Sequence, residues 1–292
     1  MDILITGGSG FIGRNLVEYL SLKHKVAAPS HAELELLDED AVKGYFKSRN
    51  FDTVIHAAIR PGHRNAKDPS NELYQNARMF FNLIRNSSSF KKIIVLSSGL
   101  VYDQRFYIPK MKEEYLGTHM PADEGGFSKY IIAKYIGKMD NAVELRVFGI
   151  FGKYEDYAIR FISNAICKTI FDLPITIKQN RKFDYVYIED FLRITEHFLQ
   201  NSGKYRSYNI TPDRAVDLYE LAKTIRKISG KDFPIKVARE GMGLEYSGDN
   251  ARLRQEMPVF KFMPVEAAIE KLYAWYSENK SSINKEFLLF DK

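Results

Sequence analysis

Short apolar runs alternate with segments of helical periodicity through the first half of the chain. The runs with strand-like patterning are 2–6, 25–28, 53–57, 92–97 and 143–148. The segments with helical or amphipathic patterning are 11–22, 40–47, 71–85 and 128–139. Strands separated by helices form βαβ units, and such units place their strands parallel in one sheet. We therefore expect an α/β fold with a doubly wound parallel sheet.

The pattern becomes less regular after Gly149. Helical periodicity continues at 159–171 and 191–199, and 183–188 is strand-like. The segment Asp217-Leu-Tyr-Glu220 resembles a capping box that opens a helix reaching Ile228, and the last helix follows Pro264. These elements predict a smaller C-terminal α+β lobe.

No low-complexity linker divides the chain, so the two units should pack closely. We expect residues 1–150 to form the first unit, with 183–205 returning to it, and 151–292 to form most of the second. The tail 281–292 is expected at the periphery.

Composition narrows the class of protein. The chain has 292 residues, 45% of them hydrophobic and 27% charged, which is ordinary for a globular protein. Its single cysteine, Cys167, allows no intramolecular disulfide and no thiolate cluster, so no metal site is predicted. The sequence from Met1 has no leader and no apolar run of membrane-spanning length, which predicts a soluble cytoplasmic protein. The net charge of +6 is spread among acidic residues, so neither a nucleic acid nor a membrane is expected as a partner.

A glycine-rich loop stands between the first expected strand and the first expected helix. It reads Thr6-Gly7-Gly8-Ser9-Gly10-Phe11-Ile12-Gly13. Glycines at such a turn let backbone amides approach a pyrophosphate, and the helix N-terminus adds a partial positive charge. Because the loop lies inside a βαβ unit, it predicts a Rossmann-type domain that binds a nicotinamide dinucleotide.

The spacing of Gly7, Gly10 and Gly13 resembles the extended branch of the short-chain dehydrogenase/reductase superfamily, the NAD-dependent epimerase/dehydratase family. Other segments that resemble motifs of this branch are Leu36-Leu37-Asp38, His56-Ala57-Ala58, Asn76, 97–102, 146–152, 183–190 and 249–253. The cofactor-binding residues implied by the resemblance are Gly7, Gly10, Phe11, Ile12, Gly13, Asp38, His56, Ala57, Ala58, Asn76 and Lys129. The similarity extends over nearly the whole chain.

The second expected strand ends without the aspartate that accepts both ribose hydroxyls of NAD in such folds. Ser30 and His31 occupy this neighbourhood, and Arg14 is a candidate to reach it. This favours NADP slightly over NAD as the cofactor.

In the family that this chain resembles, a tyrosine transfers the proton, a lysine four residues later lowers its pKa, and a serine or threonine orients the sugar oxygen. Ser98 matches the hydroxyl position. Tyr130 and Lys134 form a literal Tyr-x-x-x-Lys pair, which would lie on one face of a helix. The fuller family signature instead aligns its Ser-Lys end with Ser128-Lys129, which places Gly125 at the tyrosine position. We favour this second register, in which Lys129 holds the nicotinamide ribose.

Most members of the branch act on nucleotide-diphosphate sugars, and the segment 30–42 is most similar to the reductase side, including GDP-fucose synthase. Gly99-Leu100 replaces the Asp-Glu of family dehydratases, and Leu100 replaces a cysteine of GDP-fucose synthases. We therefore expect neither dehydration nor the epimerisation combined with reduction that GDP-fucose synthases perform. The candidate substrate-binding residues, which would contact the diphosphate, are Arg181, Lys182 and Arg239. His63 and Arg64 lie in a loop expected near the nicotinamide.

The sequence thus predicts an NAD(P)-dependent nucleotide-sugar epimerase or 4-keto reductase, and a homodimer. One alternative is a non-catalytic relative that retains the cofactor fold and acts as a binding or regulatory subunit, which Gly125 favours. The other is a reductase of a carbonyl substrate that is not a sugar.

Overall fold

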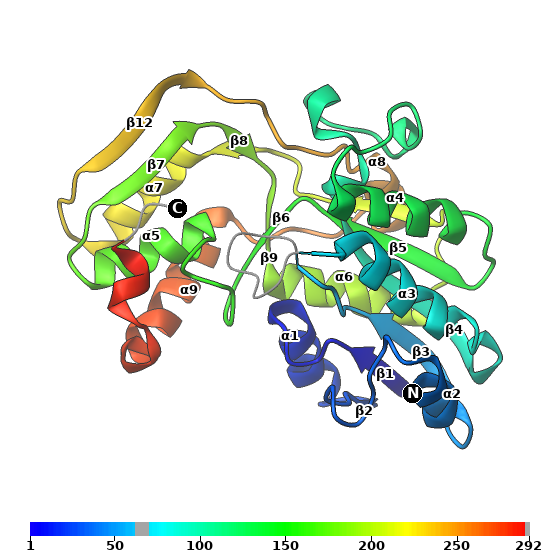
Figure 1. Cartoon of the computed structure of the whole chain (residues 1–292). Helices are drawn as coiled ribbons and strands as arrows, with labels where there is room; N and C mark the ends of the chain where they lie inside the picture. The colour runs from blue at the N-terminus through cyan, green and yellow to red at the C-terminus, as the bar shows by residue number, and fades with distance from the viewer. Residues whose placement is uncertain (62–69, 290–292) are drawn as a thin grey trace.

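The computed structural model describes residues 1–61 and 70–289 and has two lobes (Figure 1). The larger lobe contains a parallel sheet with the strand order β10-β5-β4-β3-β1-β2. Its strands are β1 (Asp2–Thr6), β2 (Lys25–Ala27), β3 (Phe51–His56), β4 (Phe90–Ser98), β5 (Ala142–Val147) and β10 (Ser207–Ile210). The predicted α/β class with a Rossmann-type parallel sheet is confirmed.

Helices cover both faces of this sheet, because its strands are apolar on both sides. In β1, Ile3 and Ile5 join one core cluster and Leu4 joins another, as the alternation of side chains along a strand requires. The first face packs against α1 (Phe11–Leu20) and α6 (Ile188–Gln200). The second face packs against α2 (Glu39–Phe46), α3 (Glu72–Ile84) and α4 (Glu124–Ile136).

The strand order reverses at β1, which lies between β2 and β3. Ligands of open α/β sheets bind outside the carboxyl ends of the strands at such a switch point. Gly7 follows β1 and Ala57 follows β3 at this edge, and the amide of Ala57 donates to the carbonyl of Thr6 over 3.2 Å. The fold therefore places the glycine loop in a crevice suited to a ligand.

The smaller lobe is built on a parallel ribbon of β7 (Ile175–Asn180) and β12 (Ile235–Met242). Its helices are α5 (Phe161–Ile170), α7 (Leu218–Ser229) and α9 (Val265–Glu278). The shorter elements are β6 (Gly149–Phe151), β8 (Lys182–Phe183), β9 (Tyr185–Tyr187), β11 (Val216–Asp217) and α8 (Ala251–Glu256). Short 3-10 helices occupy Ser87–Ser89, Gly99–Val101, Gln104–Phe106, Glu113–Tyr115, Lys280–Ser282 and Lys285–Leu288. One core cluster runs from β1 to α9, so the lobes share apolar packing.

The structure differs from the sequence expectations in three places. Helix α4 begins at Glu124, four residues before the expected start, because the carboxylate of Asp123 accepts the amide of Gly126 over 2.7 Å. The strand expected at 183–188 is divided between β8 and β9. The tail was expected at the periphery, but Ile283 and Leu288 are buried in the main core, so that expectation is wrong for these residues.

Candidate functional site

The glycine loop is shaped by two positions at which no other residue fits. Gly7 has a φ of +72°, and a Cβ atom there would lie 2.6 Å from the amide nitrogen of Ala58. A Cβ atom on Gly13 would lie 2.0 Å from the carbonyl oxygen of Gly7. Gly10 has an ordinary extended conformation, and its amide donates to the same carbonyl over 3.0 Å. The loop thus keeps its tight turn through Gly7 and Gly13, while a Cβ atom on Gly10 would meet only the carbonyl oxygen of Gly7, at 3.3 Å.

The N-terminus of α1 carries no capping side chain and no acidic residue in its first turn. By contrast, the side chains of Asp38, Asp123 and Asp217 cap α2, α4 and α7 by accepting backbone amides. The first amides of α1, at Phe11 and Ile12, are therefore not occupied by a side-chain cap. A helix end of this kind suits a negatively charged group. The residues present fit the pyrophosphate of a dinucleotide.

The segment after β3 is held by a buried asparagine. The side chain of Asn76 accepts the amide of Arg60 over 2.7 Å and donates to the carbonyl of Arg60 over 3.1 Å. Within β3, Nδ1 of His56 lies 2.8 Å from the hydroxyl of Thr6. These contacts fix the backbone of Ala57 and Ala58 beside the glycine loop.

Lys129 on α4 lies near this edge. Burial, together with a smaller effect of the nearby ammonium of Lys129, lowers the pKa of His56 to about 4. Burial also lowers the pKa of Lys129, while the charges of Glu72, Glu144 and Asp123 oppose that effect. The side chain of Lys129 therefore lies near the carboxyl end of β3.

The two alternative pairs of candidate catalytic positions, Gly125/Lys129 and Tyr130/Lys134, lie at different places on α4. A Cβ atom on Gly125 would lie 2.5 Å from Oε1 of Glu72, so a larger residue here would displace the end of that side chain. The hydroxyl of Tyr130 and the ammonium of Lys134 lie 3.8 and 3.3 Å from the Cβ position of Gly117, in the loop that precedes α4. Lys129 and Gly125 thus share one face of α4, and the Tyr130/Lys134 pair lies on another.

Ser98 ends β4 and caps the short helix that follows it, accepting the amide of Leu100 over 3.2 Å. The side chain of Tyr246 meets Ser98 there, and that of Tyr107 lies beside it. The hydroxyl of Tyr246 is in polar contact with the hydroxyls of Ser98 and Tyr107, and Tyr107 donates to the carbonyl of Gly99 over 2.7 Å. Sequence reasoning missed both tyrosines, because neither belongs to a motif of the first lobe.

The candidate diphosphate ligands lie at the ribbon of the smaller lobe. The guanidinium of Arg181 stacks 4.7 Å from the ring centre of Phe183, and its buried Nε has no hydrogen-bond partner within the described ranges. Arg239 is exposed on β12, opposite Gln179 of β7, and Lys182 is exposed. Arg181 is thus the cation of the three with an unused buried donor.

Three further expectations concern Arg14, Asp38 and the loop with His63 and Arg64. Arg14 does not extend toward Ser30, because its guanidinium lies 3.7 Å from the ring centre of Tyr154 and pairs with Glu18. Asp38 is exposed at the start of α2, where one carboxylate oxygen accepts two backbone amides. His63 and Arg64 lie outside the described residues.

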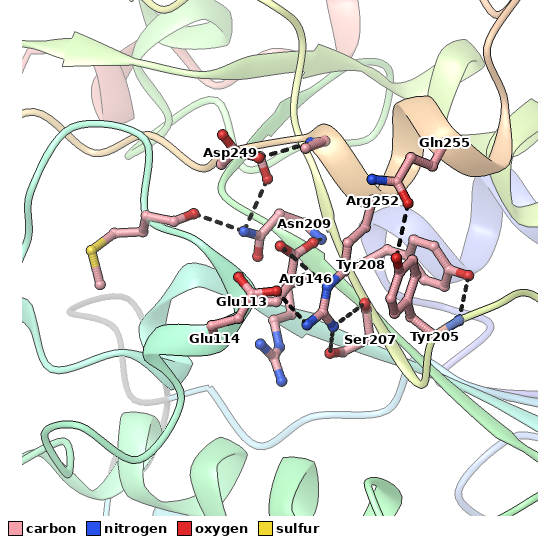
Figure 2. A network of polar contacts seen from close by, with 12 residues as sticks. Glu113, Glu114, Arg146, Tyr205, Ser207, Tyr208, Asn209, Asp249, Arg252 and Gln255 are labelled. Carbon is pink, nitrogen blue, oxygen red and sulfur yellow. Dashed lines mark hydrogen bonds and ion pairs between the residues drawn. The ribbon is translucent and has the colours of Figure 1, made fainter.

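A buried polar network supports the loops that carry the two tyrosines (Figure 2). Arg146 is 1% exposed and binds Glu144 over 2.7 Å and the hydroxyl of Tyr102 over 2.9 Å. Tyr102 donates to Asn209, whose backbone amide binds Glu113 over 2.8 Å.

The side-chain amide of Asn209 donates to the carbonyls of Met111 and Asp249. The amide of Met111 donates to the carbonyl of Ser247 over 2.9 Å. The segment 107–113 is therefore tied to the segment 246–249, and their tyrosines meet above Ser98.

The parallel sheet, the glycine loop and Ser98 at the end of β4 define a dinucleotide-binding enzyme of the short-chain dehydrogenase type. The model of the NAD dependent epimerase/dehydratase family matches residues 3–211, and the chain belongs to this family. None of the helices in the described ranges is long and apolar enough to cross a membrane.

Known relatives agree with this assignment. A GDP-L-colitose synthase of Yersinia pseudotuberculosis is 24% identical over 254 residues, which is 79% of this chain and 82% of that protein. A dTDP-4-dehydro-6-deoxy-D-allose reductase of a Streptomyces species is 25% identical over 95% of this chain and 97% of that one. The structure of a GDP-mannoheptose C4 reductase of Campylobacter jejuni, with NADP bound, has a TM-score of 0.81 at 20% identity and covers 94% of this chain and 98% of its own. The prediction of an NAD(P)-dependent enzyme of the epimerase and reductase type is confirmed over its two alternatives.

Proposed function

We propose that this protein reduces a keto group on the sugar of a nucleotide-diphosphate sugar, with NADPH as the reductant. The observation that carries the proposal is the polar contact of the Tyr246 hydroxyl with Ser98 and with Tyr107 at the carboxyl end of β4. The relatives named as reductases of nucleotide-linked sugars support the substrate class. The bound cofactor supplies a hydride, and the protein must supply the proton that accompanies it.

The residues of the larger lobe have separate roles in this proposal. The amides of Phe11 and Ile12 hold the pyrophosphate beside Gly10, and Lys129 holds the nicotinamide ribose. The position of the Lys129 ammonium beside His56 supports this register. NADP rather than NAD is supported by the sequence Ala28 to Ser30 after β2, which lacks the aspartate that accepts the ribose hydroxyls; the nearest carboxylate, that of Glu33, accepts the amide and hydroxyl of Ser30.

The protonation of the two phenols is compatible with reduction. Burial raises the pKa values of Tyr107 and Tyr246, so both phenols keep their protons at neutral pH. A protonated phenol is ready to donate to a developing alkoxide. An epimerase that starts by oxidising its sugar needs a deprotonated base instead.

We propose that residues 1–150 with 183–205 bind the cofactor and that 151–292 supply most of the substrate lobe. In the second lobe, Arg181 is the proposed ligand of the sugar-nucleotide diphosphate, with Arg239 and Lys182 beside it. Its buried, unpartnered Nε supports this role, because a charge-assisted bond to a phosphate would satisfy that donor.

Thermal unfolding with GDP, UDP, CDP and dTDP in the presence of NADPH tests the substrate class. At least one nucleotide should raise the melting temperature by several degrees at a concentration well above its Kd. Arg181→Ala should abolish most of the shift, whereas Lys182→Ala, an adjacent exposed cation, should reduce it only slightly. If no nucleotide shifts the wild-type transition, the substrate class is wrong.

A further inference from the structure

The ring of Tyr246 is held firmly over the end of β4. Its amide donates to the carbonyl of Lys182 over 2.9 Å, and its carbonyl accepts the amide of Asp184 over 3.3 Å. The ring centre lies 5.0 Å from that of Phe148 and 5.2 Å from that of Tyr107. A Cβ atom on Gly99 would lie 2.8 Å from the Tyr246 hydroxyl, so that hydroxyl lies directly against the turn after Ser98.

We propose that Tyr246, from the smaller lobe, donates the proton to the substrate carbonyl in place of the helix tyrosine of this family. The inference rests on the proposed reductase function and names the acid of that reaction. Ser98 orients the carbonyl oxygen, and the phenol of Tyr246 is in polar contact with the same serine. A carbonyl oxygen that binds Ser98 is therefore within reach of the Tyr246 hydroxyl.

Helix α4 carries no phenol at the position of the usual donor. Gly125 holds the family position, and the carboxylate of Glu72 fills the space into which its side chain would extend. Tyr130 stacks on Phe127 at a ring-centre distance of 6.1 Å and points toward Gly117. The proton must therefore come from another element, and Tyr246 supplies a phenol at Ser98.

The step balances in atoms and charge. Bound NADPH would supply a hydride to the carbonyl carbon, the C=O π electrons would move to the oxygen, and that oxygen would take the proton of the Tyr246 hydroxyl. The products are the sugar alcohol, NADP⁺ and the Tyr246 phenolate. The Tyr246 phenolate, whose side chain is only partly buried, then regains its proton from water before the next turnover.

The charges around Tyr246 suit an acid rather than a base. Burial raises its pKa, and the cation of Arg160 is the nearby charge that favours the phenolate. Tyr102 and Tyr107 are the other titratable groups that face it, and both are uncharged when protonated. Arg160 therefore stabilises the phenolate only after the proton has left.

Tyr246→Phe tests the proposal with two measurements. Turnover of a 4-keto sugar nucleotide with NADPH should fall by about 100-fold or more, the range of general acid catalysis, with KM changed by less than about threefold. In the absence of cofactor, the variant should bind the hydroxy-sugar esters UDP-glucose or GDP-mannose about fivefold more weakly, the loss of one hydrogen bond. Its affinity for UDP or GDP alone should not change.

Tyr130→Phe is the matched control and should leave turnover and both affinities unchanged. Equal turnover of Tyr246→Phe and the wild type would overturn the assignment of the acid while leaving the reductase function intact. A large loss in Tyr130→Phe would overturn it in favour of the helix pair. A wild-type protein that reduces no sugar nucleotide would instead overturn the proposed function itself, and this proposal with it.

Discussion

Arg146→Leu is expected to lower the free energy of unfolding by about 3–5 kcal/mol. The substitution removes the only cation that pairs with Glu144 in the described hydrogen bonds and ion pairs. Glu144 is fully buried, and its Oε1 already has no hydrogen-bond partner among the described residues. A buried carboxylate left without its cation carries most of its desolvation cost uncompensated. Thermal or urea unfolding of the purified variant measures the loss.

The control for this prediction removes both charges. Arg146→Leu with Glu144→Leu should cost clearly less than Arg146→Leu alone, because no unpaired charge remains in the core. A single variant as stable as the wild type, or a double variant less stable than the single one, would show that the pair does not stabilise the fold in this way.

Gly10→Leu should weaken NADPH binding by about 100-fold or more and leave the melting temperature nearly unchanged. A Cβ atom on Gly10 meets one atom within 4 Å, the carbonyl oxygen of Gly7 at 3.3 Å, so the larger side chain extends into the crevice. There it would displace the pyrophosphate from the first amides of α1. Each charge-assisted hydrogen bond lost in this way contributes roughly 1.5–3 kcal/mol to binding. Titration of nicotinamide fluorescence measures the affinity.

Three comparisons sharpen this titration. Gly13→Ala should reduce both affinity and stability, the latter by about 1–3 kcal/mol, because its Cβ would lie 2.0 Å from the carbonyl oxygen of Gly7. Lys129→Ala should weaken binding about tenfold, whereas Lys134→Ala on the same helix should not. Wild-type protein should bind NADPH more tightly than NADH. Unchanged affinity in Gly10→Leu would refute the position of the pyrophosphate.

The sheet was predictable because its strands are nearly continuous apolar runs between turns. Ile3 to Ile5 and Ile93 to Val95 are buried on both faces, so local composition identifies them. The ribbon of β7 and β12 was not predictable in this way. Seven of the eight residues of β12 are exposed, so its sequence carries no apolar alternation. The early start of α4 was not predicted because Gly125 and Gly126 have low helix propensity. Both glycines are buried in the first turn of the helix.

In the candidate site too, some residues could be predicted from local sequence and others could not. The glycine loop and Ser98 are encoded by short motifs at strand ends, where local sequence determines the conformation. Tyr246 lies 148 positions after Ser98 in the chain and is brought to it by contacts between distant segments. The network around Asn209 joins those segments, and no pattern along the chain indicates which of its buried polar side chains will meet.

The reductase function is tested most directly by following the hydride itself. Wild-type protein is incubated with NADPH deuterated at C4 of the nicotinamide and with 4-keto-6-deoxyhexose esters of GDP, UDP and dTDP. Mass spectrometry of the recovered sugar nucleotides should show one deuterium on the sugar of at least one ester, together with NADP⁺. If NADPH binds and no ester acquires deuterium, the protein is not the nucleotide-sugar 4-keto reductase that we propose.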